Sequence, residues 1–160
     1  MNGPVLTAAL IGLIVCYLSR LIVGCLVDRV KSGITVPPPS EALKADWEEL
    51  TSDQNDKSGA WLGDLERITF FFAFWFSAYA VVVAWFAFKV AAKWEAWGNI
   101  VALPGALDGT DQIRYLISRR RWASQRLMSF LIGALANVLV AFATVVAAKH
   151  LVLPLIRSCA

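Results

Sequence analysis

The chain has 160 residues, about the size of one domain, and it is more apolar than a typical water-soluble protein. Hydrophobic residues make up 58%, charged residues 17%, and the mean hydropathy is +0.60. The formal net charge of +3 is too small to indicate a DNA-binding protein, which needs a strongly basic face. Composition therefore argues against a soluble enzyme, a nucleic-acid-binding module and a disordered tail, and it favours a single membrane domain over residues 1–160.

Three apolar stretches reach the roughly 20 residues that cross a hydrocarbon core of about 30 Å. They cover residues 4–27, 68–90 and 127–148. Each must be helical, because a lone segment in lipid can satisfy its backbone polar groups only internally. The first stretch lacks a preceding basic region and is too long for the core of a signal peptide, so we expect it to be retained. The predicted fold is all-α, an integral membrane bundle of three transmembrane helices.

The loop between the first two spans, residues 28–66, is acidic. Nine acidic residues stand against four basic ones, which leaves a net charge of −5. The three prolines at 37–39 predict a stiff, extended break. Ser40 can then cap a short amphipathic helix in which Leu43, Trp47 and Leu50 share one face. We expect this helix to rest on the bilayer or on the end of the bundle.

The loop between the last two spans, residues 91–126, is basic. Asp108 or Thr110 can cap a second amphipathic helix that runs through Trp122. Such a helix fits the membrane interface, with its arginines toward anionic lipid headgroups. A docking site for a partner protein is the alternative. The residues expected to contact headgroups are Arg119, Arg120, Arg121 and Arg126.

The distribution of basic residues predicts an orientation, because cytoplasmic loops are rich in lysine and arginine. Lys89 and Lys93 at the end of the second span, with the arginines that precede the third, favour a cytoplasmic basic loop. Arg29 and Lys31 follow the first span and favour the opposite arrangement. Because the basic residues of the loop at 91–126 and at the end of the second span outnumber Arg29 and Lys31, we predict a cytoplasmic N-terminus, an acidic loop outside, and a C-terminus outside.

Each span carries one face of small residues, the feature through which membrane helices pack closely. Lys89 falls nearly opposite the face of the second span, so we expect it to extend to the cytoplasmic interface. The residues predicted to pack between helices are Gly12, Cys16, Ala73, Ser77, Ala80, Ala84 and Gly133, with Asn137 and Thr144 as interhelical polar contacts.

Arg20 is a charge inside the first span, and such a charge is by default a functional hypothesis that needs a partner. Its position lets the guanidinium reach toward the start of the second helix, where Glu66 lies on the small-residue face. We therefore predict a partly buried ion pair between Arg20 and Glu66 that joins the first two spans. The alternative is an Arg20 that extends to the lipid headgroups.

The residues of catalysis and metal binding are not arranged for either role. The one histidine, His150, lies beside Lys149 at the end of the third span, away from the acidic loop. The cysteines Cys16, Cys25 and Cys159 have neither metal-ligand spacing nor the pattern of a disulfide framework. We expect no enzymatic activity, no metal and no cofactor.

From Gly59 onward the sequence resembles an uncharacterised family of bacterial multi-span membrane proteins, a domain of unknown function. The family's pattern is G-x-x-G-x-L-E-R, then a lysine followed by a basic-aromatic pair, then F-L-I-G opening the next span. The residues that carry it here are Gly59, Leu62-Gly63, Leu65-Glu66-Arg67, Lys89, Lys93-Trp94 and Phe130-Leu131-Ile132-Gly133. The match covers the last two spans, and Met128 departs from the glutamate that the pattern has before L-I-G. The resemblance implies a bacterial inner-membrane protein and gives weight to Glu66 and Arg67.

The sequence predicts a non-enzymatic membrane protein that acts by helix–helix association. Its partners would be the lipid bilayer with anionic headgroups and either further copies of the chain or another membrane subunit. A pore-forming or membrane-permeabilising effector, holin-like or defence-related and built around Asn137, Thr144 and Arg20, is the main alternative. A small transporter has less in its favour, because no inverted repeat or broken mid-span helix stands out in the sequence.

Overall fold

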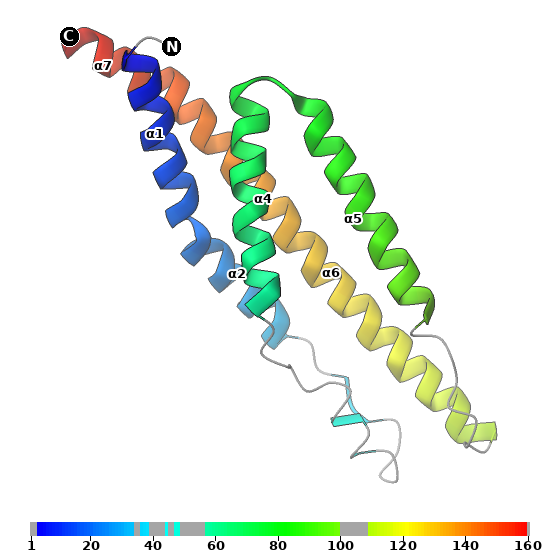
Figure 1. The fold of residues 1–160 in the computed structure, drawn as a ribbon. Helices are drawn as coiled ribbons and strands as arrows, with labels where there is room; N and C mark the ends of the chain where they lie inside the picture. The colour runs from blue at the N-terminus through cyan, green and yellow to red at the C-terminus, as the bar shows by residue number, and fades with distance from the viewer. Residues whose placement is uncertain are drawn as a thin grey trace.

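The computed structural model describes residues 3–33, 36–38, 44, 47–48, 57–99 and 109–159, and these contain helices and connecting segments but no strand. Two helical segments, Gly3–Ser32 and Ile113–Cys159, are long and apolar enough to cross a membrane. The elements in chain order are α1 (Gly3–Leu18), α2 (Arg20–Ser32), α4 (Lys57–Trp75), α5 (Tyr79–Asn99), α6 (Gly109–Ala147), the π-helical turn η2 (Ala148–Val152) and α7 (Leu153–Cys159) (Figure 1).

The first predicted span lies within a nearly continuous rod made of α1 and α2. The rod is interrupted only at Ser19, whose hydroxyl donates to the carbonyl oxygen of Cys16. Backbone hydrogen bonds continue across the interruption, from Ser19 to Val15 at 3.1 Å and from Val23 to Ser19 at 3.0 Å. A serine that bonds back to its own helix commonly bends it without ending it.

The prediction that residues 68–90 form one membrane-spanning helix is wrong, because the chain reverses in the middle of this stretch. Helix α4 ends at Trp75, and α5 begins at Tyr79. Ser77 adopts a positive φ of 60°. The amide of Ala78 donates to the carbonyl of Ala73 at 2.7 Å, and that of Ser77 donates to the carbonyl of Phe74 at 3.3 Å. This pair of bonds is a Schellman C-cap with serine in the left-handed position that glycine usually occupies.

The side chain of Lys149 reinforces this helix end from across the bundle. Its Nζ donates to the backbone carbonyl of Trp75 at 2.8 Å and lies 5.3 Å from the centre of the Trp75 ring. A cation is favourable at a helix C-terminus, because the last carbonyls have no partner within the helix and the helix dipole is negative there. Lys149 therefore stabilises the point at which the chain turns back.

The third predicted span is helical but belongs to a longer helix. Helix α6 has 39 residues and runs without a break from Gly109 through the basic segment into residues 127–147. The expected interfacial helix is therefore the first half of α6 rather than a separate element. In the acidic loop Ser40, Leu43 and Leu50 lie outside the described residues.

Trp47, from the acidic segment, packs against the basic half of α6. Its ring makes an edge-on contact with Tyr115, with 6.2 Å between the ring centres. Its indole N–H donates to the carbonyl oxygen of Val36 at 3.2 Å. Both aromatic residues are buried, so this part of the acidic segment contacts the bundle itself.

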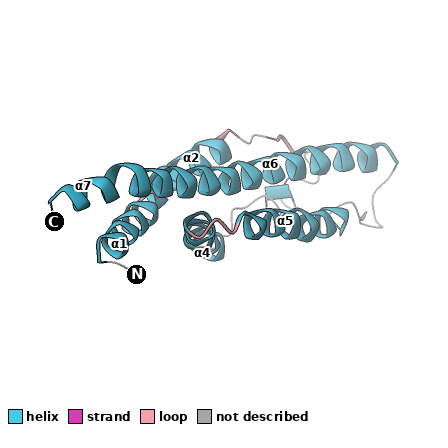
Figure 2. Ribbon diagram, turned by 90° about the horizontal axis from the view of Figure 1, so that it is seen from above, coloured by secondary structure: helices cyan, strands magenta, loops and turns pink. Residues whose placement is uncertain are grey.

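The reversal at residues 76–78 changes how the whole chain is arranged. α4 and α5 form an antiparallel hairpin that lies on one side of α6 (Figures 1 and 2). The C-terminal ends of α2 and α5 and the N-terminal ends of α4 and α6 all lie at one end of the bundle, whereas α7 and the start of α1 lie at the other (Figure 1). Both loops therefore leave the bundle at the same end.

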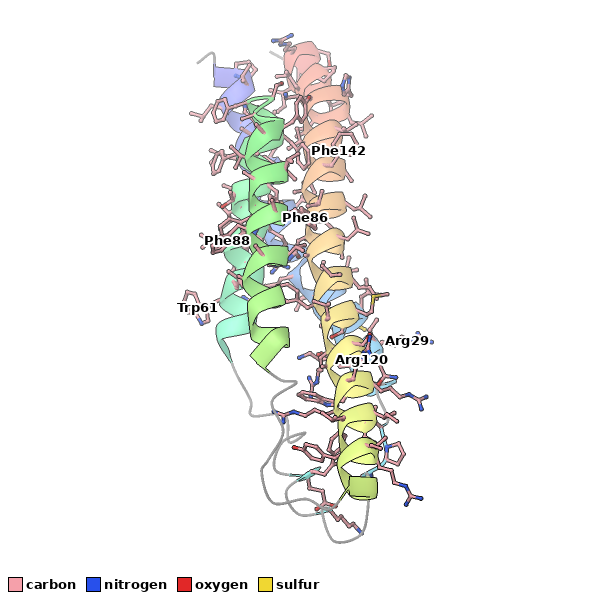
Figure 3. The ribbon with its side chains drawn as sticks, turned by 90° about the vertical axis from the view of Figure 1, so that its right-hand side faces the viewer. Arg29, Trp61, Phe86, Phe88, Arg120 and Phe142 are labelled. Atoms are coloured by element: carbon pink, nitrogen blue, oxygen red, sulfur yellow. The ribbon has the colours of Figure 1, made fainter. Side chains whose placement is uncertain are left out.

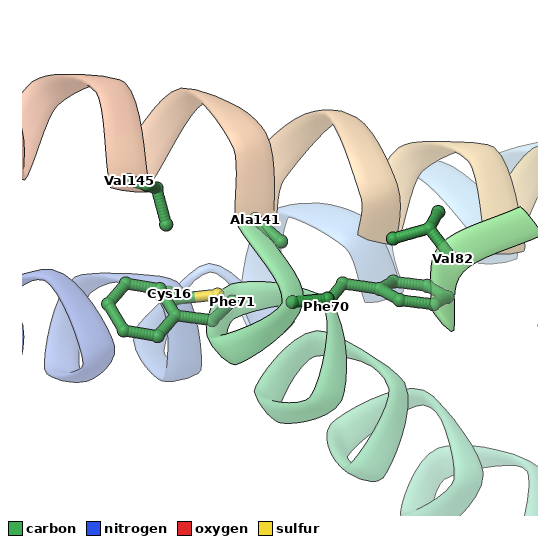
Figure 4. Packing of buried hydrophobic residues seen from close by; sticks show 7 residues of the cluster. Cys16, Phe70, Phe71, Val82, Ala141 and Val145 are labelled. Atoms are coloured by element: carbon green, nitrogen blue, oxygen red, sulfur yellow. The ribbon is translucent and has the colours of Figure 1, made fainter. Parts of the chain in front are cut away.

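The apolar core lies where α1, α4, α5 and α6 meet. Phe70 and Phe71 of α4 are fully buried and lie between the other helices (Figure 4). The Phe70 ring stacks on Phe86 of α5, with 6.3 Å between centres. The remaining buried members of this core are Cys16, Ala73, Val82, Ala141 and Val145.

Two glycines allow the close helix contacts around this core. A methyl group at Gly12 would lie 2.9 Å from Cβ of Ala148, and one at Gly133 would lie 3.1 Å from a methyl of Val27. The first distance is shorter than a carbon–carbon contact allows, so α1 can approach η2 only with glycine at position 12. Gly12 and Gly133 thus lie between helices, as the small-residue faces of the first and third spans predict.

Candidate functional site

A cluster of charged side chains lies inside the bundle, and Glu66 of α4 is at its centre. Only 1% of Glu66 is exposed. Its Oε1 forms an ion pair with Nζ of Lys89 on α5 and accepts a hydrogen bond from the Trp85 indole at 3.0 Å. Its Oε2 accepts a hydrogen bond from Nδ2 of Asn137 on α6 at 3.0 Å. One carboxylate thus joins three helices.

Arg67, the next residue of α4, extends the cluster. Its Nη1 donates to Oδ1 of Asn137 at 2.7 Å, and its Nη2 forms an ion pair with Asp64 one turn earlier. Asn137 therefore donates to Glu66 and accepts from Arg67, so both the NH2 group and the oxygen of its side-chain amide are used. Arg67 is 5% exposed, and its Nε is buried without a hydrogen-bond partner among the described residues.

The cluster ends at the bundle surface with Arg20. The Nη1 of Arg20 lies 3.9 Å from Oδ2 of Asp64 and donates to the Tyr17 hydroxyl at 2.9 Å. Half of the Arg20 side chain is exposed, compared with 22% of the Asp64 side chain. The network therefore runs from the α1–α2 surface through α4 and Asn137 to Lys89.

The position of Asn137 in α6 shows where the cluster lies along the apolar length of the bundle. Asn137 lies about 15 Å of helical rise from each end of the apolar stretch 127–148. Gly63, one turn before Arg67, lies at the same level, because a methyl group there would be 3.6 Å from Nδ2 of Asn137. The charges are thus placed near the middle of the apolar length of the bundle.

The predicted ion pair between Arg20 and Glu66 is not the one that forms. Glu66 is paired with Lys89, and Arg20 lies beside Asp64 instead. The reason is the reversal at Ser77, which brings Lys89 back to the level of Glu66. For the same reason Lys89 points into the bundle, 4.3 Å from the Phe130 ring centre, instead of extending to the interface.

The reversal also divides the predicted small-residue face of the second span between α4 and α5. Ala73 is buried in α4, but Ser77, Ala80 and Ala84 are exposed. On α5 the inward face carries Val82 and Lys89, so the alanines on its opposite side point away from the bundle. The small face of α5 is therefore a surface and not an internal packing contact.

The other predicted polar contact, Thr144, bonds both within its own helix and across to α1. Its hydroxyl donates to the carbonyl oxygens of Val140 and Ala141, and its side chain is hydrogen-bonded with the Cys16 thiol. Cys16 is buried, and its thiol donates to the carbonyl oxygen of Arg67 at 3.7 Å. Cys16 thus connects α1 with α4 through Arg67 and with α6 through Thr144.

The four arginines of the basic segment divide into two kinds. Arg120 and Arg121 are exposed. Arg119 and Arg126 are half-buried and lie over aromatic rings of the same helix, 5.7 Å from Tyr115 and 5.4 Å from Trp122. Figure 3 places Arg120 and Arg29 toward the end of the bundle from which the loops leave.

The arrangement of the cluster suits a structural role. The carboxylates of Asp64 and Glu66 both contact cations, so neither is placed as an unpaired acid or base. The network crosses the bundle at one depth and does not run along its length. Among the described residues, no three histidine, cysteine or acidic side chains come together as a metal site would require.

Sequence reasoning singled out four members of this cluster, Arg20, Glu66, Arg67 and Asn137, but it missed Asp64 and Trp85. The spacing of Asp64 and Arg67, three residues apart on one helix, was the signal that could have paired them. Comparisons of the chain with protein-family models, with curated proteins and with solved structures find no match.

Proposed function

We propose that the protein is a multi-pass membrane protein that acts by helix–helix association. The observation that carries this proposal is an inverted distribution of polarity. Leu21 and Ile22 of α2 and Val83 of α5 are each about 70% exposed, whereas Glu66 and Lys89 are buried. Trp61, which is 77% exposed, also projects outward (Figure 3). Charges inside and large apolar side chains outside suit a hydrocarbon environment.

The hairpin supports an orientation different from the one expected for three spans. With both loops at one end, Arg29, Lys31 and the arginines of α6 lie on the same side. The opposite end carries only Lys149, His150 and Arg157 among the described residues. The positive-inside rule then favours cytoplasmic loops, with α7 and the start of α1 on the other side. Arg29 and Lys31, which opposed the first orientation, agree with this one.

Association is supported by the outward face of α5. Ala80, Ala84, Ala87 and Ala91 recur at steps of four and three residues, and all four are exposed. Small residues at this spacing allow the backbones of two membrane helices to approach closely. We propose that this face packs against another membrane helix, from a second copy or from another subunit.

The association is tested by cross-linking through cysteine in native membranes. In a chain whose own cysteines are replaced by alanine, Ala84→Cys should form a disulfide-linked dimer or a cross-link to a partner. The matched control is Val82→Cys, on the buried face of the same helix, which should not react. Equal cross-linking of both variants, or monomer alone from Ala84→Cys, would contradict the proposal.

The pore-forming alternative has less support. Asn137 is buried and uses both ends of its amide inside the bundle, and the Thr144 side chain bonds to carbonyl oxygens of its own helix and to the Cys16 thiol. A water-filled lumen needs polar groups that face it. The described residues of the core, Phe70 and Phe71 with their neighbours, are apolar and closely packed.

A further inference from the structure

The buried cluster carries unequal numbers of positive and negative charges. Its ionisable members are Arg20, Asp64, Glu66, Arg67 and Lys89. Three cations against two carboxylates leave a net charge of +1. Near the middle of a bilayer such an excess is costly, because hydrocarbon does not solvate it.

The excess charge is located at Arg20. Glu66 already receives an ion pair and two hydrogen bonds, and Lys89 is its direct partner. Asp64 is in close contact with Arg67, and its other oxygen is 3.9 Å from Arg20. The remaining contact of Arg20 is with Tyr17, whose hydroxyl and ring are uncharged. Arg20 is therefore the least compensated member of the cluster.

Arg20 also lies within the apolar length of the first span, in the proposed membrane location. Along the rod of α1 and α2 it is about 12 Å of helical rise from Asp28, and about 25 Å from Gly3. On the face of the rod that carries Arg20, Tyr17 and Gly24 are exposed. Half of the Arg20 side chain is nevertheless open to the surroundings. Charged residues within membrane spans almost always face a partner or a water-filled cavity.

We propose that the surface around Arg20 is a docking site for a membrane-spanning helix of another protein that carries a carboxylate at its middle. This inference rests on the proposed membrane location. A carboxylate there would cancel the excess charge and form a bidentate pair with the guanidinium, which is the geometry that arginine favours. Tyr17 and Gly24, which flank Arg20 on the same face of the rod and are exposed, would lie against the apolar remainder of that helix.

A second copy of the chain does not supply this carboxylate. In a symmetric pair about an axis along the membrane normal, every residue keeps its depth. In the described part of α1 and α2 the one acidic residue is Asp28, about 12 Å away from the depth of Arg20. Asp64 and Glu66 are already engaged within their own bundle.

The test uses the full chain reconstituted into vesicles of neutral phosphatidylcholine, with a fluorophore on Cys159 and Cys25 replaced by alanine. The probes are synthetic membrane-spanning peptides of about 20 leucine and alanine residues. Each peptide has glutamate or leucine at its centre and carries an acceptor fluorophore. Energy transfer at mildly alkaline pH measures the association of peptide with the chain.

The glutamate peptide should associate about tenfold more tightly than the leucine peptide, the scale of one interhelical polar contact. Arg20→Met should remove this preference, Arg20→Lys should keep part of it, and Ile22→Ala, an exposed position on the opposite face of α2, should leave it intact. Equal association of both peptides, or a preference that survives in Arg20→Met, would overturn the inference.

Two other occupants give distinct results that would also overturn it. Arg20-dependent energy transfer between copies of the chain, with no peptide present, would assign the surface to a second copy. Loss of the glutamate preference when phosphatidylglycerol is added would assign it to a lipid phosphate. Failure of the unaltered chain to enter vesicles would instead contradict the proposed membrane location.

Discussion

The carboxylate of Glu66 is shared between Lys89, Trp85 and Asn137. All three side chains therefore depend on the negative charge of Glu66. Removing one member of a buried ion pair leaves the other charge without compensation, whereas removing both is much less costly. The location of the pair makes this difference large, because Glu66 and Lys89 are both buried at the middle of the apolar bundle.

We predict that Glu66→Gln and Lys89→Met each lower the free energy of unfolding by about 3–5 kcal/mol. The double variant Glu66→Gln/Lys89→Met should lose less than the sum of the two single changes, because it leaves no unpaired charge. Unfolding of the purified protein by titration with denaturing detergent measures these differences. Glu48→Gln, at an exposed position, is the control. Additive losses would show that the two residues do not act as a pair.

The residues of this cluster were partly predictable from sequence and partly not. A charge or an amide inside an apolar span is visible directly, which is why Arg20 and Asn137 were identified. The partner of Glu66 was not, because Lys89 follows it by 23 positions in a stretch that reads as one continuous helix. Only the reversal between them makes the two side chains meet.

At the scale of single elements, the turn at residues 76–78 decides the arrangement of the chain. No glycine or proline occurs between Ile68 and Val90, so the usual signals of a helix end are missing. Ser77 adopts the left-handed conformation without the freedom of glycine, which costs a non-glycine residue about 1–2 kcal/mol. The hairpin contacts and the cap from Lys149 offset that cost.

We predict that Ser77→Gly raises the stability of the protein by about 1 kcal/mol, because glycine adopts a positive φ without steric cost. Ser77→Val should lower it by more than that amount, since a β-branched residue is strongly disfavoured there. Thermal unfolding in detergent measures both changes. A continuous helix through residue 77 would give the opposite order, with glycine the less stable variant.

The glycines of the first rod provide a second comparison at this scale. We predict that Gly12→Ala destabilises the protein by about 1–3 kcal/mol, since the added methyl group would overlap Ala148. Gly24→Ala meets no atom within 4 Å and should be neutral or slightly stabilising, because alanine favours a helix more than glycine does. The same unfolding assay compares the two, and equal effects would contradict the close contact between α1 and η2.

At the scale of the whole molecule, hydropathy predicted the helical class and the two long apolar segments. It could not predict their topology, because a window of apolar residues has the same hydropathy whether it forms one helix or a tight hairpin. The basic residues support the proposed topology. With both loops on one side of the membrane, as we propose, Arg29 and Lys31 agree with the other basic residues.

The measurement that tests the account most directly is the accessibility of single cysteines to a maleimide that does not cross membranes. Cys159 alone, and Ser32→Cys alone, are compared in intact cells and in permeabilised cells. The hairpin arrangement predicts that Cys159 reacts in intact cells and that Ser32→Cys reacts only after permeabilisation. Reaction of both in intact cells would place the acidic loop outside and contradict the shared side of the two loops.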